Sequence, residues 1–324
     1  MNLTLTAIHA LLGATALLIP HMSRRYLYFG VHVGEDFRAS DTGRRTLRNY
    51  RFLVLACTAV SLLLQPVLWR LPELAAGVAP LLPFAGAAIG WVLGHRAVKP
   101  HSASPTVREA ELVEDDRLPK WIWLAVIPYA VLTSVGLYLV MNWGTIPERY
   151  PVHFDLAGNP NGWATKTPMH VFGSLLGGAA LLSMLLVLGI ATFYGARRSR
   201  LRTASLGVVI SSMYLTAFVL TSVGLLPLVR LRTWAVLGPV FIFVTGILIW
   251  SVHFLSQPDD EPVEATPDEC WYGGFLYYNP KDPAILVEKR AGIGYTFNFA
   301  NRWAWVWLGG LLLVVALVTR LLGA

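Results

Sequence analysis

The sequence is poor in charged residues, and long stretches of it carry none. Charged residues make up 14% of the chain, against about 25% in ordinary soluble domains. No charge occurs in Val171–Tyr194 or in Ala204–Val229. Each stretch can cross a bilayer core of roughly 30 Å, which takes about 20 apolar residues as a helix. A single soluble globular domain is excluded, and we predict a polytopic membrane protein.

Cysteine is scarce, and no Asp, Glu, Lys or Arg lies deep in a predicted span. Cys57 falls in a span and Cys270 in a loop, so no disulfide between them is expected. The missing charges argue against an ion-coupled pump, which needs an ionisable group within the membrane. No zinc-like spacing or nucleophile motif is present, and we predict no catalytic residue, no metal and no cofactor. For His9 and His253 we favour structural roles, with His9 bonding a serine or a carbonyl of a neighbouring helix.

The apolar runs predict an all-α membrane protein, a bundle of about eight transmembrane helices with a structured external loop and a small cytoplasmic β-rich segment. Gly86, Gly90 and Gly94 repeat every four residues, which favours close packing of that helix against a neighbour. The predicted spans are Leu3–Pro20, Phe52–Trp69, Leu74–Gly94, Trp121–Trp143, Val171–Tyr194, Ser205–Leu228, Trp234–Leu255 and Trp303–Arg320.

The Lys and Arg residues orient this bundle. The loops after the first, third, fifth and seventh spans hold 20 of the 26 basic residues. Because basic loops stay in the cytoplasm, this asymmetry places both termini outside. We read the first span as a retained anchor, since Arg24 and Arg25 follow it directly.

The same pattern divides the chain into five segments. We expect an N-terminal three-helix membrane unit (1–120) and a module of helix, external loop and helix (121–194). Two further transmembrane helices (195–256), a cytoplasmic β-rich segment (257–302) and a last transmembrane helix (303–324) follow.

The external loop from Pro147 to His170 is the densest group of polar residues. Its glycine, asparagine and proline residues at 158–162 favour a turn, and the alternation before them favours a strand, so we predict a hairpin-like cap. His153, Asp155 and Lys166 are expected to converge there. One alternative is a metal site that includes His170. Another is acid–base catalysis by His153, with Thr165 or Thr167 as the nucleophile. We favour a third, a loop held rigid by its own hydrogen bonds. The candidate ligand-binding residues are His153, Asp155, Gly158, Asn159, Asn161, Gly162, Trp163, Lys166, Arg230 and Arg232.

Arg230 and Arg232 lie in a short outside loop, against the positive-inside trend. A compensating partner is therefore expected. The candidate partners are Asp155, Glu148 and lipid headgroups, and we hypothesise that one of the two arginines pairs with the Asp155 loop.

The loop residues resemble a known bacterial membrane family. Pro151, His153, Phe154 and Asp155, followed by Gly158, Gly162, Trp163 and Lys166, are similar to the pattern of the domain of unknown function 1648. That module occurs at the front of Sdp-type toxin immunity proteins. The resemblance implies a multi-pass protein of a bacterial cell membrane, and it implies no reaction.

A second group of residues lies in the aromatic-rich segment before the last span. Trp271–Tyr278, Ala284–Val287 and Ile293–Phe299 are predicted to be short strands. We expect them to dock on the other cytoplasmic loops or on the membrane surface, with Lys289 and Arg290 facing anionic lipid. The segment also contains a group of aromatic, glycine, proline and polar residues at fixed spacing: Trp271, Gly274, Tyr277, Asn279, Pro280, Asp282, Pro283, Lys289, Arg290, Gly292, Gly294 and Asn298. These residues resemble the pattern of the domain of unknown function 5808.

Three functions compete at this point. We favour a non-enzymatic sensing, immunity or regulatory protein that binds an envelope-side peptide or protein through loop 147–170. The alternative is a transporter or lipid-handling protein with a polar cleft among helices four to seven, and the third is an intramembrane enzyme using His153 and Asp155. The bilayer is the expected partner, a homo-oligomer is considered, and no nucleic-acid partner is predicted.

Overall fold

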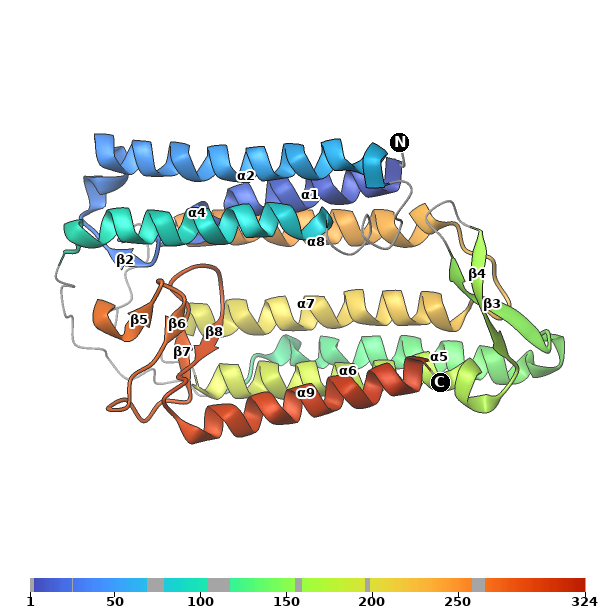
Figure 1. Cartoon of the computed structure of the whole chain (residues 1–324). Coiled ribbons are helices and arrows are strands. Elements are labelled where there is room, and N and C mark those ends of the chain that lie inside the picture. The colour runs from blue at the N-terminus through green and yellow to red at the C-terminus, as the bar shows by residue number, and fades with distance from the viewer. Residues whose placement is uncertain are drawn as a thin grey trace. The chain divides into compact units, whose positions relative to one another are not determined.

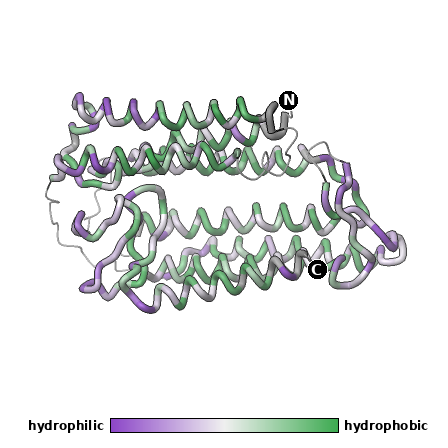
Figure 2. Tube along the Cα trace, in the orientation of Figure 1, coloured by the Kyte–Doolittle hydropathy of each residue, from purple (hydrophilic) through white to green (hydrophobic). Residues whose placement is uncertain are grey.

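The computed structural model describes residues 3–24, 26–68, 79–103, 117–154, 159–195, 199–257 and 266–323. Long helices dominate these ranges, and four two-stranded antiparallel sheets accompany them (Figure 1). Apolar residues run along the helices, and polar residues gather at helix ends and in the hairpins (Figure 2). The chain contacts define two compact units, Met1–Leu112 with Thr245–Asn301 and Val113–Val244 with Arg302–Ala324.

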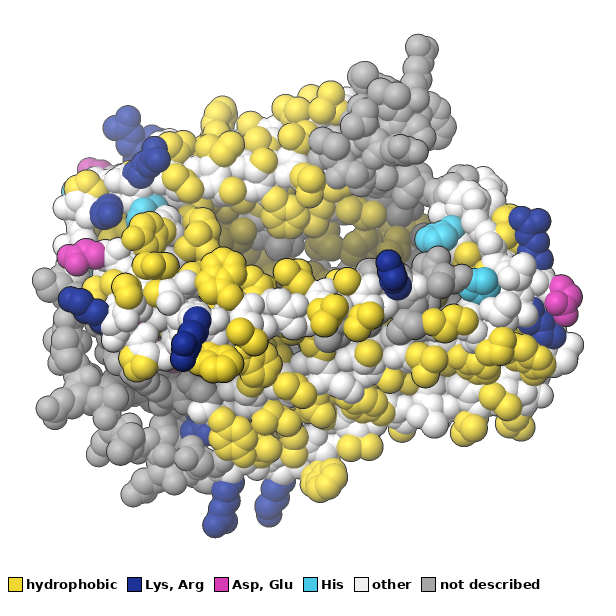
Figure 3. All heavy atoms as spheres, turned by 60° about the horizontal axis from the view of Figure 1, so that its bottom comes forward, with side chains coloured by type: hydrophobic (Ala, Val, Ile, Leu, Met, Phe, Trp, Pro, Cys, Tyr) yellow, Lys and Arg dark blue, Asp and Glu magenta, His cyan; other side chains and the backbone are white. Residues whose placement is uncertain are grey.

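Among the described residues, six helical stretches are long and apolar enough to cross a membrane, and two shorter apolar helices, Thr6–Met22 and Arg302–Leu317, accompany them. Hydrophobic side chains cover much of the visible helical surface, as lipid contact requires (Figure 3). The chain is therefore a multi-pass membrane protein, while the count of eight spans stays a prediction. The six stretches are Asp41–Leu64, Ala79–His101, Lys120–Met141, Pro168–Tyr194, Leu201–Gly224 and Trp234–Ser256.

In the first unit, α1 (Leu3–Leu18), α2 (Asp41–Leu68) and α4 (Leu82–Val98) pack together. Gly86 and Gly90 of α4 allow its backbone to approach α2, and Gly94 faces the ring of Phe29. A Cβ added at Gly86 would lie 2.9 Å from Cys57, and one at Gly90 would lie 2.9 Å from the ring of Tyr50. The predicted packing role of the glycine repeat is confirmed.

Short strands of the same unit lie at one end of these helices (Figure 1). A first hairpin pairs β1 (Leu27–Tyr28) with β2 (Val31–His32), and a second pairs β7 (Leu286–Glu288) with β8 (Tyr295–Phe297). The prediction of one strand over Trp271–Tyr278 is wrong. This stretch is a hairpin of β5 (Trp271–Tyr272) and β6 (Leu276–Tyr277), because Gly273 and Gly274 have φ of +62° and +78° and reverse the chain.

The second unit packs α5 (Val126–Met141), α6 (Pro168–Gly195), α7 (Ser199–Gly224) and α9 (Arg302–Gly323). Its core includes Leu139, Leu182 and Met213, which are fully buried. The chain between α5 and α6 forms the predicted hairpin, with β3 (Arg149–Phe154) antiparallel to β4 (Pro160–Thr165). The remaining long helix, α8 (Thr233–Ser256), belongs to the second unit up to Val244 and to the first unit from Thr245.

Candidate functional site

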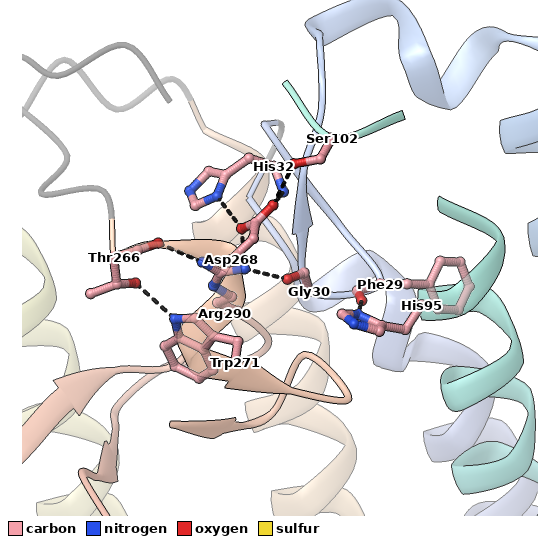
Figure 4. Close-up of polar contacts among 9 residues, drawn as sticks. All are labelled: Phe29, Gly30, His32, His95, Ser102, Thr266, Asp268, Trp271 and Arg290. Carbon is pink, nitrogen blue, oxygen red and sulfur yellow. Dashed lines mark hydrogen bonds and ion pairs between the residues drawn. The ribbon is translucent and has the colours of Figure 1, made fainter. Parts of the chain in front are cut away.

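A buried cluster of polar side chains in the first unit joins the segment before α9 to the loop between α1 and α2 (Figure 4). Asp268, in the short helix η7 (Asp268–Cys270), lies at its centre. Its Oδ1 atom is 2.7 Å from Nδ1 of His32 on β2. Its Oδ2 atom accepts a hydrogen bond of 2.6 Å from the hydroxyl of Ser102. Residues from three distant parts of the chain thus share one carboxylate.

Arg290 completes the cluster, and its side chain is 3% exposed. Nη1 donates to Asp268 Oδ1 and to the carbonyl of Gly30, and Nη2 donates to the carbonyl of Thr266. The guanidinium also stacks 4.8 Å from the ring centroid of Trp271. The expectation that Arg290 faces lipid is therefore wrong. The partly buried carboxylate of Asp268 and two carbonyls compensate its charge within the protein.

The pKa values of the central pair follow from this geometry. Burial alone would raise the pKa of Asp268, but the hydrogen bonds from His32 and Ser102 and the charge of Arg290 outweigh it. They hold the pKa of Asp268 well below its usual range. Burial lowers the pKa of Arg290, and the charge of Asp268 opposes that shift. At neutral pH the two groups form a charged ion pair, in which Arg290 is buried and Asp268 is partly buried.

A second ion pair lies beside the cluster. Arg24 Nη2 is 2.8 Å from Glu288 Oε2, and both side chains are mostly buried. Burial lowers the pKa of Arg24, but the charge of Glu288 outweighs this and the net shift is upward. The backbone amide of Gly292 also donates to the carbonyl of Met22, at 2.7 Å. The β7–β8 hairpin is thereby fixed to the segment that follows α1.

Two glycines bring the β5–β6 turn against the β1–β2 turn. A Cβ at Gly274 would lie 2.9 Å from Gly30 Cα and 2.9 Å from His95 Nδ1. The indole of Trp91 on α4 donates to the carbonyl of Gly273 at 2.9 Å, and the ring of His95 bonds the carbonyl of Phe29 at 2.9 Å. The sequence motif requires Gly274 because any side chain would hold the two turns apart.

Most of the remaining motif residues lock the loop between β6 and β7. Asn298 is fully buried, and its side chain bonds backbone atoms of Asn279, Asp282 and Ala300. The hydroxyl of Tyr277 donates to Asp282 Oδ2 at 2.9 Å. Burial raises the pKa of Tyr277 to about 12. These residues satisfy one another, which indicates a structural turn more than a ligand site.

Within the part of the chain that the structure describes, the other motif residues form no side-chain contact in the cluster above. The carbonyl of Pro283 accepts a hydrogen bond from the side chain of Asn301. Pro280 and Lys289 are exposed. Gly292 and Gly294 have φ of +81° and +114° in the turn between β7 and β8. A side chain at either position would strain the turn.

The chemistry of the cluster does not favour catalysis. In a serine–histidine–acid arrangement the imidazole lies between the hydroxyl and the carboxylate, so that it can take the hydroxyl proton. Here Ser102 and His32 both bind the carboxylate of Asp268 directly. Within the described ranges, no three or more His, Cys, Asp or Glu side chains lie close enough to hold a metal ion.

The β3–β4 hairpin of the second unit is the other candidate. At its base the ammonium of Lys166 lies 3.9 Å from Glu148 and 5.2 Å from the ring centroid of Trp143. The backbone amide of Lys166 also donates to the carbonyl of Glu148 at 2.9 Å. These contacts place Lys166 at the root of the hairpin, so it anchors the loop and does not converge on His153.

The tip and outer face of this hairpin carry the other predicted residues. His153, Asn159, Asn161 and Trp163 are exposed, and the guanidinium of Arg149 lies 5.6 Å from the ring centroid of Trp163. Gly162 lies opposite His153, and a Cβ there would be 2.7 Å from His153 Cβ. Asp155 and Gly158 lie outside the described residues.

Arg230 and Arg232 follow α7 and are exposed. Their proposed partner, Asp155, is not among the described residues. The pairing therefore stays a hypothesis.

The polar residues of α5 to α7 are engaged mainly within their own helices. The hydroxyls of Ser134, Ser212 and Thr216 donate to carbonyls four residues earlier. Tyr214 bonds the carbonyl of Leu124, which ties α7 to the start of α5. These bonds give no support to a polar cleft there.

The two histidines of the predicted spans differ. His9 is fully buried, and its Nδ1 atom lies 3.0 Å from the hydroxyl of Ser61, which itself donates to the carbonyl of Ala79. The expected bond from His9 to a serine of a neighbouring helix is confirmed. His253 is exposed near the end of α8, 3.4 Å from the amide nitrogen of Gln257.

The comparisons with known proteins agree with both sequence resemblances. Residues 130–177, from α5 to the start of α6, match a domain of unknown function (DUF1648). Residues 280–305 match a family of unknown function (DUF5808), and this match begins after Trp271, Gly274 and Tyr277. No curated protein and no solved structure matches the chain. The chain is thus a multi-pass membrane protein that is similar to these two families in separate segments.

Proposed function

We propose that the protein is a non-enzymatic membrane protein of sensing, immunity or regulatory type, which binds an envelope-side ligand through the β3–β4 hairpin. The observation that supports this is a hairpin fixed at its base by Lys166 and open on its outer face. His153, Asn161 and Trp163 are all exposed on this hairpin, and Trp163 is half exposed. A rigid root lowers the entropy lost when such a face binds.

The chemistry of the face favours a peptide or protein ligand. Trp163 offers a large apolar ring, Asn161 offers an amide, and His153 offers an imidazole. Arg149 beside Trp163 adds a positive charge that suits a carboxylate or a backbone carbonyl. Arg230 and Arg232 would extend this positive region towards an acidic ligand.

The orientation is part of the proposal. We infer a bacterial cell membrane crossed eight times, with both termini and the hairpin on the outer side. The support is the distribution of basic residues, 20 of 26 of which lie in the loops assigned to the cytoplasm.

Photocrosslinking in intact cells tests the ligand proposal. A benzophenone side chain replaces Asn161, and we expect a discrete crosslinked product that Trp163→Ala abolishes without lowering the amount of protein in the membrane. The matched control is a benzophenone at Trp123, a tryptophan that is 77% exposed at the other end of α5. An identical product from both positions, or none from position 161, contradicts the proposal.

Cysteine labelling tests the orientation separately. In a Cys57→Ser, Cys270→Ser background, Asn161→Cys should react with an impermeant maleimide in intact cells. In the wild type, Cys270 should react only after the cells are opened. The reverse pattern rejects the orientation.

A further inference from the structure

The β5–β6 hairpin presents an uncharged aromatic face that the packing of the first unit leaves uncovered. Strand alternation directs Trp271 and Tyr277 inwards, where both are buried. Tyr272 and Leu276 point outwards, and Phe275 lies at the turn; these three are 59%, 42% and 52% exposed. No charged residue occurs between positions 270 and 280. Such a face is unfavourable in water and has to be explained.

The height of this hairpin along the membrane helices is fixed by α4. The indole of Trp91 donates to the carbonyl of Gly273, and Gly274 packs against His95. Both Trp91 and His95 belong to the candidate span Ala79–His101. Trp91 precedes the end of α4 at Val98 by a rise of about 10 Å. The hairpin tip therefore lies beside a membrane-spanning helix, and not beyond its end.

The end of α4 is where a bilayer interface is expected. Exposed Arg96 and Lys99 mark the level of the headgroups, and Trp91 and the hairpin tip lie on the apolar side of them. Tyrosine and tryptophan rings concentrate at this depth, because one part of the ring is apolar and the other forms hydrogen bonds.

We propose that Tyr272, Phe275 and Leu276 insert into the lipid interface and anchor residues 266–301, here called the tail segment, to the bilayer. Lipid at the boundary between the headgroups and the acyl chains would thus cover these three side chains. The inference depends on the membrane insertion of α4 and is independent of any ligand for the β3–β4 hairpin.

Site-directed spin labelling of the full chain tests this anchor. In the Cys57→Ser, Cys270→Ser background, Phe275→Cys and Leu276→Cys are labelled separately in nanodiscs of phosphatidylcholine and phosphatidylglycerol. Collisions with oxygen, which concentrates in lipid, are compared with collisions with water-soluble nickel ethylenediaminediacetate. The matched control is Lys281→Cys, an exposed charged position just after the same hairpin.

We expect the labels at 275 and 276 to collide more with oxygen than with the nickel complex, and the label at 281 to show the reverse. Equal access of the nickel complex to 275, 276 and 281 would place the hairpin in water. Exclusion of both reagents from 275 and 276 would mean that protein covers the face. Either result overturns the proposal, and unchanged thermal unfolding midpoints of the labelled variants exclude misfolding as the cause.

Discussion

Nδ1 of His32 lies 2.7 Å from Oδ1 of Asp268, although 236 residues separate the two along the chain. Ordering so long a connection costs entropy, which the contact must offset. Arg290 contributes to that offset, because its side chain is 3% exposed and pairs with the same carboxylate, which is 18% exposed. The segment before α9 is therefore held on the α1–α2 loop by one acidic side chain.

Replacing the side chain of Asp268 should release the tail segment, residues 266–301, from the α1–α2 loop. Asp268→Asn leaves the buried guanidinium of Arg290 without a counter-charge, which we expect to cost about 3 kcal/mol. The measurement is the thermal unfolding midpoint in detergent, together with tryptic cleavage after Lys289 and Arg290. Glu269→Gln is the matched control, because Glu269 is the adjacent, exposed acid. An equal effect of both substitutions would contradict a specific role for Asp268.

The low pKa of Asp268 predicts the pH range of this stabilisation. The native pKa lies below the unfolded value of about 3.9, so the contribution is fully present above about pH 4 and is lost as the pH falls towards the native pKa. The difference in unfolding midpoint between wild type and Asp268→Asn should be constant from pH 7 to 5. Below pH 4 it should shrink. A difference that grows in acid would refute this assignment.

The sequence alone predicts the elements that depend on local pattern. Apolar runs mark the helices, and the glycine, asparagine and proline residues at 158–162 mark the β3–β4 hairpin. The glycines of α4 predict close packing, and Cys57 and Tyr50 provide it. In each case the physical signal lies within a few residues of the element that it forms.

The buried cluster could not be found in this way. Asp268 follows a run of acidic and proline residues and looks like the end of a solvated linker, and His32 looks like part of a basic loop. Only a contact across most of the chain gives either one a partner. The prediction for Arg290 is wrong for the same reason. An arginine next to Lys289 suggests a charge that faces lipid, and only the fold shows that it pairs with the carboxylate of Asp268. The turn in β5–β6 did have a signal, the pair Gly273–Gly274.

Packing between α4 and the β1–β2 turn predicts a second stability effect. A Cβ at Gly94 would lie 2.6 Å from the ring of Phe29, which is fully buried between Tyr50 and Trp91 and has no room to move. Gly94→Ala should therefore destabilise the first unit by about 1–3 kcal/mol. Gly136→Ala on α5 meets its nearest neighbour at 3.6 Å and should be neutral or stabilising. Thermal midpoints that fall equally for both would show that Gly94 is not tightly packed.

The contact between the two glycine turns gives the sharpest comparison of substitutions. Gly274 and Gly292 have similar backbone angles, with φ of +78° and +81°, so an alanine at either position adds about 1–2 kcal/mol of strain. At Gly274 the new methyl would also lie 2.8 Å from the carbonyl oxygen of Phe29, whereas at Gly292 its nearest neighbour is the end of Met22, at 3.9 Å. Gly274→Ala should therefore open the tail to trypsin and to amide hydrogen exchange over residues 266–301. Gly292→Ala should raise exchange only around the β7–β8 turn. If the two variants exchange alike, backbone strain alone accounts for the effect of both substitutions, and the close approach of Gly274 to Gly30 contributes nothing to docking.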